Sequence, residues 1–206
     1  MALSYAPTER RAAVQALLDL DQVLGGILRS TREPLIGQMR LTWWYDALRA
    51  LDEQRPPAEP ALAALALHVL PQGVAGATLA SMVDGWEMLL CDPLTMDEVR
   101  RFGTERGAGL FRAAAAVLGA TDEAIIAAGE GWALADLSRN LGDARLAVQV
   151  RALASERLVA AFSRRWSRPA RSLGALALLA RADLTGVPIG SPRRVARLLR
   201  HRFTGR

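Results

Sequence analysis

The stretch Glu33–Leu48, EPLIGQMRLTWWYDAL, contains the strongest signals for the fold. Pro34 suits the first turn of a helix, and we expect that helix to run from Pro34 to about Asp52. Trp43 and Trp44 are adjacent, so their side chains should leave the helix in directions that differ by about 100°. We therefore expect one tryptophan to be buried in the core and the other to be partly exposed or at an interface.

Helical periodicity recurs along almost the whole chain, and no segment shows the alternation that is typical of a strand. Alanine and leucine dominate, and the loops between helical stretches are short, which favours an antiparallel bundle. We expect an all-α protein with a single domain over residues 1–206. The expected helices cover about residues 8–28, 34–52, 61–70, 74–90, 95–118, 121–141, 148–166, 169–182 and 192–202.

Charge is distributed unevenly along the chain. The net charge is +5, and every basic residue other than the histidines is an arginine. Residues 164–206 contain eleven arginines and one acidic residue, a net charge of +10, whereas the first 163 residues carry a net charge of −5. Such asymmetry indicates an anionic partner, such as a membrane surface or an acidic protein. A nucleic acid is not expected, because no recognised motif accompanies the charge.

The arginine-rich helix at about residues 192–202 contains the main candidates for contact with a membrane or a partner protein. It also contains apolar residues, so two interpretations stay open. The helix could lie on an anionic membrane, or it could pack its apolar side on the bundle while its arginines face solvent. The candidate residues are Arg193, Arg194, Arg197 and Arg200.

The single cysteine and the apolar runs limit the classes of protein to consider. Cys91 is the only cysteine, which excludes an internal disulfide and fits a reducing compartment. No apolar run reaches the ~20 residues that are needed to span a bilayer. The N-terminal stretch does not resemble a signal peptide. We expect a cytoplasmic protein, with peripheral association at the inner face of a membrane if the arginine-rich end binds lipid.

Residues 33–48 resemble the signature EP-x-x-G-x-x-R-L-x-W-W-x-x-x-L of the squalene/phytoene synthase superfamily. The likeness is closest to a branch of synthase-like proteins that includes a mitochondrial complex I assembly factor. Residues 82–88, 99–119 and 131–140 resemble later helices of the family in the same order, so the resemblance covers nearly the whole chain. It implies an isoprenoid-synthase-type antiparallel helical bundle.

The active members of this family need paired carboxylates that the present chain lacks. They carry D-D-x-x-D on the first helix and D-x-x-x-D on a later one, where bound Mg²⁺ neutralises a prenyl diphosphate and helps it to leave. The aligned positions here are Gly25, Gly26 and Arg29 in the first motif, and Asn140 and Ala144 in the second. The two glycines could instead mark a close contact between helices.

Three acidic residues lie near these degenerate motifs, and they are the catalytic candidates if the chain is active: Asp21, Asp136 and Asp143. Asp21 lies on the apolar stripe of the first helix, where a buried carboxylate needs a partner such as an arginine. Asp136, Asn140 and Asp143 share one helical stripe, but one stripe does not form a two-sided clamp for Mg²⁺.

The resemblance therefore implies a non-catalytic synthase-like protein without a metal or another cofactor. Such a protein would help to assemble a respiratory membrane complex, by binding one of its subunits, or would bind an isoprenoid or another lipid. The alternative is an active prenyltransferase of the squalene/phytoene synthase type, with an altered site that uses Mg²⁺. The ligand, the partner and the oligomeric state stay open.

Further candidates for ligand binding are three arginines and the two tryptophans. Arg32, Arg40 and Arg139 could hold a phosphate, or they could form salt bridges with neighbouring acidic residues. Trp43 and Trp44 could line a pocket for a prenyl chain, although core packing is the expected role for at least one of them.

Overall fold

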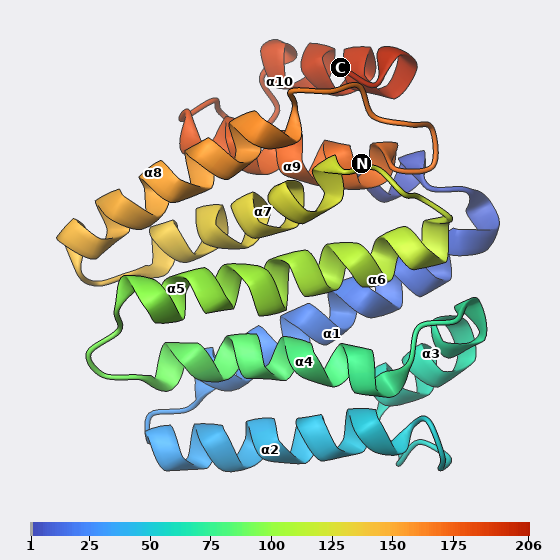
Figure 1. The fold of residues 1–206 in the computed structure, drawn as a ribbon, viewed down its shortest axis with the longest axis vertical. Helices are drawn as coiled ribbons and strands as arrows, with labels where there is room; N and C mark the ends of the chain where they lie inside the picture. The colour runs from blue at the N-terminus through green and yellow to red at the C-terminus, as the bar shows by residue number, and fades with distance from the viewer. Residues whose placement is uncertain (1) are drawn as a thin grey trace.

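The computed structural model describes residues 2–206, and this part of the chain contains helices and no strands (Figure 1). The expected all-α class is therefore confirmed. The helices are α1 (Arg11–Ser30), α2 (Pro34–Ala50), α3 (Pro60–His68), α4 (Gly76–Glu87), α5 (Met96–Phe102), α6 (Gly109–Leu118), α7 (Ala124–Asn140), α8 (Ala144–Ala161), α9 (Arg171–Leu184) and α10 (Pro192–Thr204). A π-helical segment, η5 (Gly103–Ala108), joins α5 to α6.

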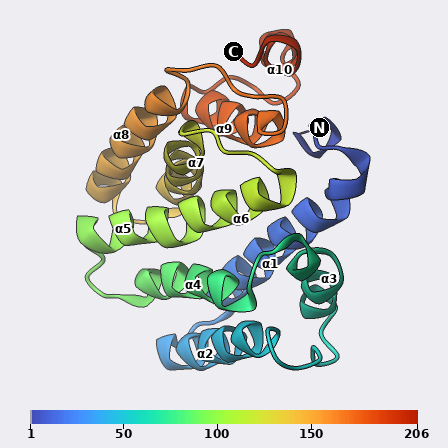
Figure 2. The same ribbon diagram turned by 45° about the vertical axis from the view of Figure 1, so that its right-hand side comes forward.

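The helices are stacked in a row that begins with α2 and ends with α10 (Figure 1). α4 packs on α2, and the rod formed by α5, η5 and α6 packs on α4. α7 follows with α8 beside it, then α9, and α10 is outermost. α1 crosses behind α4 and α6 and contacts both (Figure 2). A continuous apolar cluster extends through these layers from α1 to α9. Within residues 2–206, no helix is long and apolar enough to cross a bilayer.

Two approximate helix boundaries differ from the structure by two residues, next to an aspartate that caps a helix far from it in sequence. The predicted helix 34–52 ends at Ala50, and the predicted helix 74–90 begins at Gly76. The Asp52 carboxylate accepts hydrogen bonds from the backbone amides of Gly76 (2.6 Å) and Ala77 (2.9 Å). Asp52 therefore satisfies the first orphan amides of α4 rather than continuing α2.

The predicted helix 148–166 is displaced at both ends. It begins at Ala144, because the Asp143 carboxylate accepts hydrogen bonds from the amides of Arg145 (2.8 Å) and Leu146 (3.2 Å) as an N-cap. It ends at Ala161, and the chain then turns so that the indole of the buried Trp166 donates to the Ala161 carbonyl (3.0 Å). Apolar residues that follow the end of a helix can thus continue its periodic sequence pattern, although the backbone there is no longer helical.

Three glycines bring η5 unusually close to its neighbours. A Cβ on Gly107 would overlap the carbonyl oxygen of Gly129 on α7, and a Cβ on Gly129 would overlap that of Gly107. On the other side, a Cβ on Gly85 of α4 would lie 2.7 Å from the backbone nitrogen of Arg106. The missing side chains allow α4 and α7 to close on the π-helical segment, which therefore lies deep inside the bundle.

Candidate functional site

Two cavities that are partly open to solvent lie side by side and share Arg29, Arg106 and Asp136 in their walls. The first, here called the central cavity, has a volume of about 370 Å³ and a mostly apolar wall. The second, here called the charged cavity, has a volume of about 400 Å³ and extends to α9 and α10. Gly25 and Arg29 reach the central cavity from α1, and Asp136 and Asn140 reach it from α7. Three of the five degenerate motif positions, Gly25, Arg29 and Asn140, therefore face the same space.

The side chain between the two cavities is Arg106, which η5 holds in the interior with only 3% of its surface exposed. Its Nε and Nη2 donate to the two carboxylate oxygens of Asp21, at 2.8 and 2.9 Å. Its Nη1 donates to Oδ2 of Asp136 at 2.9 Å. Burial alone would lower the pKa of Arg106, but the charges and hydrogen bonds of Asp21 and Asp136 raise that pKa above its ordinary value. The guanidinium is a fixed positive charge in the centre of the molecule.

Three aromatic rings lie around this guanidinium. Its central carbon lies 4.1 Å from the ring centroid of Trp86, 4.8 Å from that of Trp132 and 5.1 Å from that of Phe102. A guanidinium is attracted to the negative face of such rings, and the attraction is stronger where water is excluded. The rings and the two carboxylates together compensate for the cost of burying Arg106.

The ion pairs around Arg106 continue as a chain to the outermost helix. Arg139 bridges Asp136 (3.4 Å) and Asp183 (3.2 Å), and Asp183 also accepts from Arg194 (2.7 Å). Three carboxylates and three guanidiniums therefore alternate, and their charges balance. In order, the members are Asp21 on α1, Arg106 on η5, Asp136 and Arg139 on α7, Asp183 on α9 and Arg194 on α10.

The residues around the central cavity do not fit the Mg²⁺ ions that the family signature implies. Mg²⁺ requires an octahedral set of oxygen ligands and binds proteins mainly through carboxylates. Both oxygens of Asp21 accept from Arg106, and the oxygens of Asp136 accept from Arg106 and Arg139. Asp143 caps α8 and faces neither cavity. Within residues 2–206, no three side chains of metal-binding type lie together.

The aligned positions of the first motif have different surroundings. Gly25 is buried, and a Cβ there would lie 2.8 Å from the Trp86 ring, so the space of the missing side chain is taken by a tryptophan side chain rather than by the backbone of another helix. Gly26 has no such neighbour, since the nearest atom to a Cβ there would be Nη2 of Arg29 at 4.0 Å. Arg29 is exposed and lines both cavities. In the second motif, Asn140 lines the central cavity, but Ala144 is an exposed residue at the start of α8.

The remaining ligand-binding candidates, Arg32, Arg40, Trp43 and Trp44, lie outside the two cavities, and Arg139 lines the charged cavity. Arg40 donates from Nη1 to the hydroxyls of Ser30 and Thr31, both at 3.1 Å, and so fastens α2 to the end of α1. Arg32 is exposed in the turn between these helices. Trp44 is 6% exposed and Trp43 is 48% exposed, which confirms that one ring is buried and the other is not. Neither ring lines the central or the charged cavity.

The four candidate arginines of the arginine-rich helix α10 have two kinds of surroundings. Arg194 is partly buried, bonds to Asp183 and lines the charged cavity. Arg193, Arg197 and Arg200 are exposed on the surface of α10. The helix does pack an apolar residue, Leu198, on the bundle, as one of the two interpretations expects, but exposed arginines are compatible with both.

Arg106 is the residue that the sequence analysis does not identify. The position of Asp21 on an apolar stripe predicts an arginine partner, but it does not say which of the 26 arginines is used. A signal is present in the segment Gly103–Gly109, where a single arginine lies among closely spaced glycines inside a helical pattern. Glycines at such spacing mark close backbone approach, which would bury the arginine between them.

Comparison with known proteins identifies the family. A family model described as squalene/phytoene synthase matches residues 1–152, which include the sequence from α1 to the first half of α8. No curated protein and no solved structure matches the chain. The matched residues are well over half of the chain, so the protein belongs to the squalene/phytoene synthase family.

Proposed function

We propose that this member of the squalene/phytoene synthase family binds an isoprenoid or another lipid in its central cavity and does not ionise a diphosphate. The observation that carries the proposal is the position of Arg106 between Asp21 and Asp136. A guanidinium there supplies one positive charge to the two carboxylates, so neither carboxylate is free to hold a divalent cation. The motif positions Gly25 and Arg29 add no further oxygen ligand.

The wall of the central cavity supports binding of a ligand with an apolar chain. Its volume of about 370 Å³ lies near the lower end of the ~300–1,000 Å³ that is typical of ligand pockets. That size suits a short prenyl chain or one segment of a longer lipid. The apolar residues of the wall are Leu28, Trp86, Leu89, Leu94, Phe102, Leu137 and Leu141.

Arg29 gives the same cavity a recognition group for an anionic head. Within residues 2–206 it has no carboxylate within salt-bridge distance, and its one hydrogen bond, to the Gln22 carbonyl, is long at 3.5 Å. A free guanidinium binds phosphate oxygens in a bidentate manner without a metal. We therefore assign to Arg29 the phosphate or carboxylate of the ligand.

Calorimetric titration with farnesyl diphosphate and with uncharged farnesol tests this proposal. The protein is expected to bind both in EDTA, because the site uses no metal. Arg29→Gln should weaken farnesyl diphosphate about tenfold, the value of one lost charge-assisted hydrogen bond, and leave farnesol unchanged. Arg32→Gln is the matched control, since Arg32 is an exposed arginine three residues away that lines neither cavity. Absence of binding, or equal loss in both variants, would refute the proposal.

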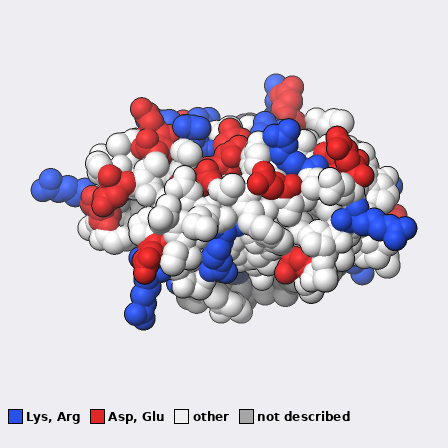
Figure 3. All heavy atoms as spheres, turned by 90° about the horizontal axis from the view of Figure 1, so that it is seen from below, with Lys and Arg blue, Asp and Glu red and all other residues white. Residues whose placement is uncertain are grey.

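We further propose that such a protein acts as an assembly factor for a respiratory membrane complex. The resemblance to the assembly-factor branch suggests this role, and an exposed apolar face on α2 supports it. Leu35, Ile36, Met39 and Trp43 are exposed along that helix. Seen from below, where α2 is outermost, acidic and basic side chains are interspersed with uncharged surface (Figure 3). Such a mixed surface suits contact with a protein subunit. Unchanged complex I levels after deletion of the protein would contradict this role.

A further inference from the structure

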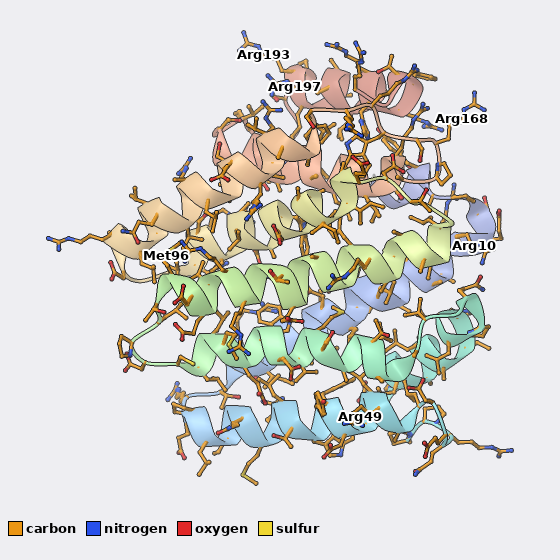
Figure 4. The ribbon with its side chains drawn as sticks, in the orientation of Figure 1. Arg10, Arg49, Met96, Arg168, Arg193 and Arg197 are labelled. Atoms are coloured by element: carbon orange, nitrogen blue, oxygen red, sulfur yellow. The ribbon has the colours of Figure 1, made fainter. Side chains whose placement is uncertain are left out.

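Positive charge without a partner is concentrated where α9 and α10 form one end of the molecule (Figure 4). The only acidic residue after position 163 is Asp183, which already bonds to Arg139 and Arg194. Arg164 pairs with Glu123. Within the described chain, the other nine arginines of this segment have no carboxylate within salt-bridge distance.

These uncompensated charges affect one another. Burial lowers the pKa of Arg171, and repulsion from Arg165 and Arg168 lowers it further. In Figure 4, Arg168 and Arg193 extend away from the body of the protein rather than toward it. A surface of this kind attracts anions and binds them more strongly at low salt.

A third cavity lies within this basic region, and we call it the arginine cavity. It has a volume of about 260 Å³ and lies between the end of α8, α9 and α10. Four arginines line it and no carboxylate does, so its wall is complementary to a phosphate group. The lining residues are Phe162, Leu178, Arg181, Arg197, Arg200 and Arg206.

Apolar side chains project beside the arginine cavity on the outer surface of α10. Leu198 and His201 are the buried residues of this helix, and Leu199 and Phe203 lie on its opposite side. Phe203 is 73% exposed, and Ile189, in the loop before α10, is 90% exposed. Arg200 and Arg193 lie on the same outer surface next to Phe203, since a helix turns about 100° per residue. The outermost helix therefore presents a combined apolar and basic surface.

We propose that α10 lies on an anionic phospholipid membrane, with Leu199 and Phe203 at the boundary between headgroups and acyl chains and a headgroup phosphate in the arginine cavity. Amphipathic helices with basic residues beside exposed large apolar ones bind this kind of interface. The positive surface is complementary to anionic headgroups, whose phosphates match the four arginines. A nucleic acid would use the same charges but would leave Leu199, Phe203 and Ile189 exposed to water. This proposal does not depend on the ligand of the central cavity.

Liposome flotation of the full chain tests the proposal. The protein should float with vesicles of phosphatidylcholine mixed with phosphatidylglycerol and stay unbound with phosphatidylcholine alone. Arg197→Gln/Arg200→Gln should weaken partitioning roughly 30-fold, since each arginine near an anionic surface contributes about five- to sixfold. Phe203→Ser should also weaken partitioning, because it removes apolar contact and leaves the charge unchanged.

The matched control is Arg49→Gln/Arg55→Gln, which removes the same charge from two exposed positions, one on α2 and one in the loop that follows it. Figure 4 shows Arg49 at the end of the molecule opposite to α10. The control should reduce partitioning by less than about twofold. Equal flotation of the control and the α10 variant would overturn the proposal, as would equal binding to both kinds of vesicle or no flotation at all. Release of the bound protein by inorganic phosphate at constant ionic strength would identify a soluble phosphate ligand instead. The protein could also bind an oligonucleotide more tightly than vesicles, and the α10 variant could abolish that binding while its flotation stays unchanged. This result would identify a nucleic acid as the partner. Either release by phosphate or this result would overturn the proposal.

Discussion

At the scale of single residues, the adjacent Gly25 and Gly26 have different surroundings. A Cβ on Gly25 would meet the buried ring of Trp86 at 2.8 Å and Nη1 of Arg29 at 3.0 Å. The Trp86 ring in turn packs on the Arg106 guanidinium. Gly25 is thus required by the packing around the central charge, whereas Gly26 faces open space and carries only the cost of a glycine inside a helix.

This difference predicts opposite effects of the same substitution at neighbouring positions. Gly26→Ala should stabilise the fold by about 0.5–1 kcal/mol, because alanine is the better helix former and nothing obstructs its methyl group. Gly25→Ala gains the same propensity but must displace Trp86, which costs about 1–3 kcal/mol, so a net destabilisation is expected. Urea denaturation of both variants measures the two changes. Stabilisation by Gly25→Ala would show that the Trp86 ring does not need the space of a glycine.

At the scale of helices, local signals predict most elements but not the contacts between them. Helical periodicity and Pro34 are sufficient to predict α2 from the sequence. The start of α8 is predicted too late, because the role of Asp143 as its N-cap becomes clear only in the structure. The cap that Asp52 provides for α4 is not visible in the sequence, because 24 residues separate the aspartate from Gly76. Such tertiary capping needs the fold itself, which explains why helix ends were less predictable than helices.

The packing of α10 on α9 depends on a buried histidine. His201 is fully buried, and its Nε2 lies 3.1 Å from the Arg171 carbonyl. The aromatic rings of Phe162 and Trp166 also contact it. Burial lowers the pKa of His201 below its ordinary value of 6.5. A hydrogen bond with the Arg171 carbonyl opposes this shift, and the nearby charge of Arg171 adds to it. The neutral imidazole is therefore the form that fits beneath α10.

Acid should consequently loosen α10. Because the folded pKa of His201 lies below the unfolded value of 6.5, its contribution to stability is complete above pH 6.5 and is lost as the pH falls from 6.5 through the lower folded pKa. Hydrogen exchange of the α10 amides, corrected for intrinsic rates, should show weaker protection at pH 5 than at pH 7.5. His201→Gln removes the titrating group and should flatten this dependence. An equally steep loss of protection in the variant would mean that another group titrates there.

At the scale of the whole molecule, a series of ion pairs connects helices from α1 to α10. A balanced chain of six charged residues extends from α1 through η5, α7 and α9 to α10, and the central and charged cavities border it. Replacing Arg106 would leave the buried carboxylate of Asp21 without its partner, whereas Asp136 and Asp183 each have a second arginine. The sequence predicts the acidic members near the motifs and the need of Asp21 for a partner. It does not predict Arg106, because its burial results from three glycines on three different elements.

The release of inorganic diphosphate from farnesyl or geranylgeranyl diphosphate, with Mg²⁺ in excess, tests most directly whether Arg106 has replaced the metal site. We expect the wild-type protein to release no more diphosphate than a control without protein, and Asp136→Ala and Asp143→Ala to behave identically. The alternative of an active prenyltransferase with an altered Mg²⁺ site predicts clear release by the wild type. Release that either substitution abolishes would contradict the account of a cavity that binds lipid without chemistry.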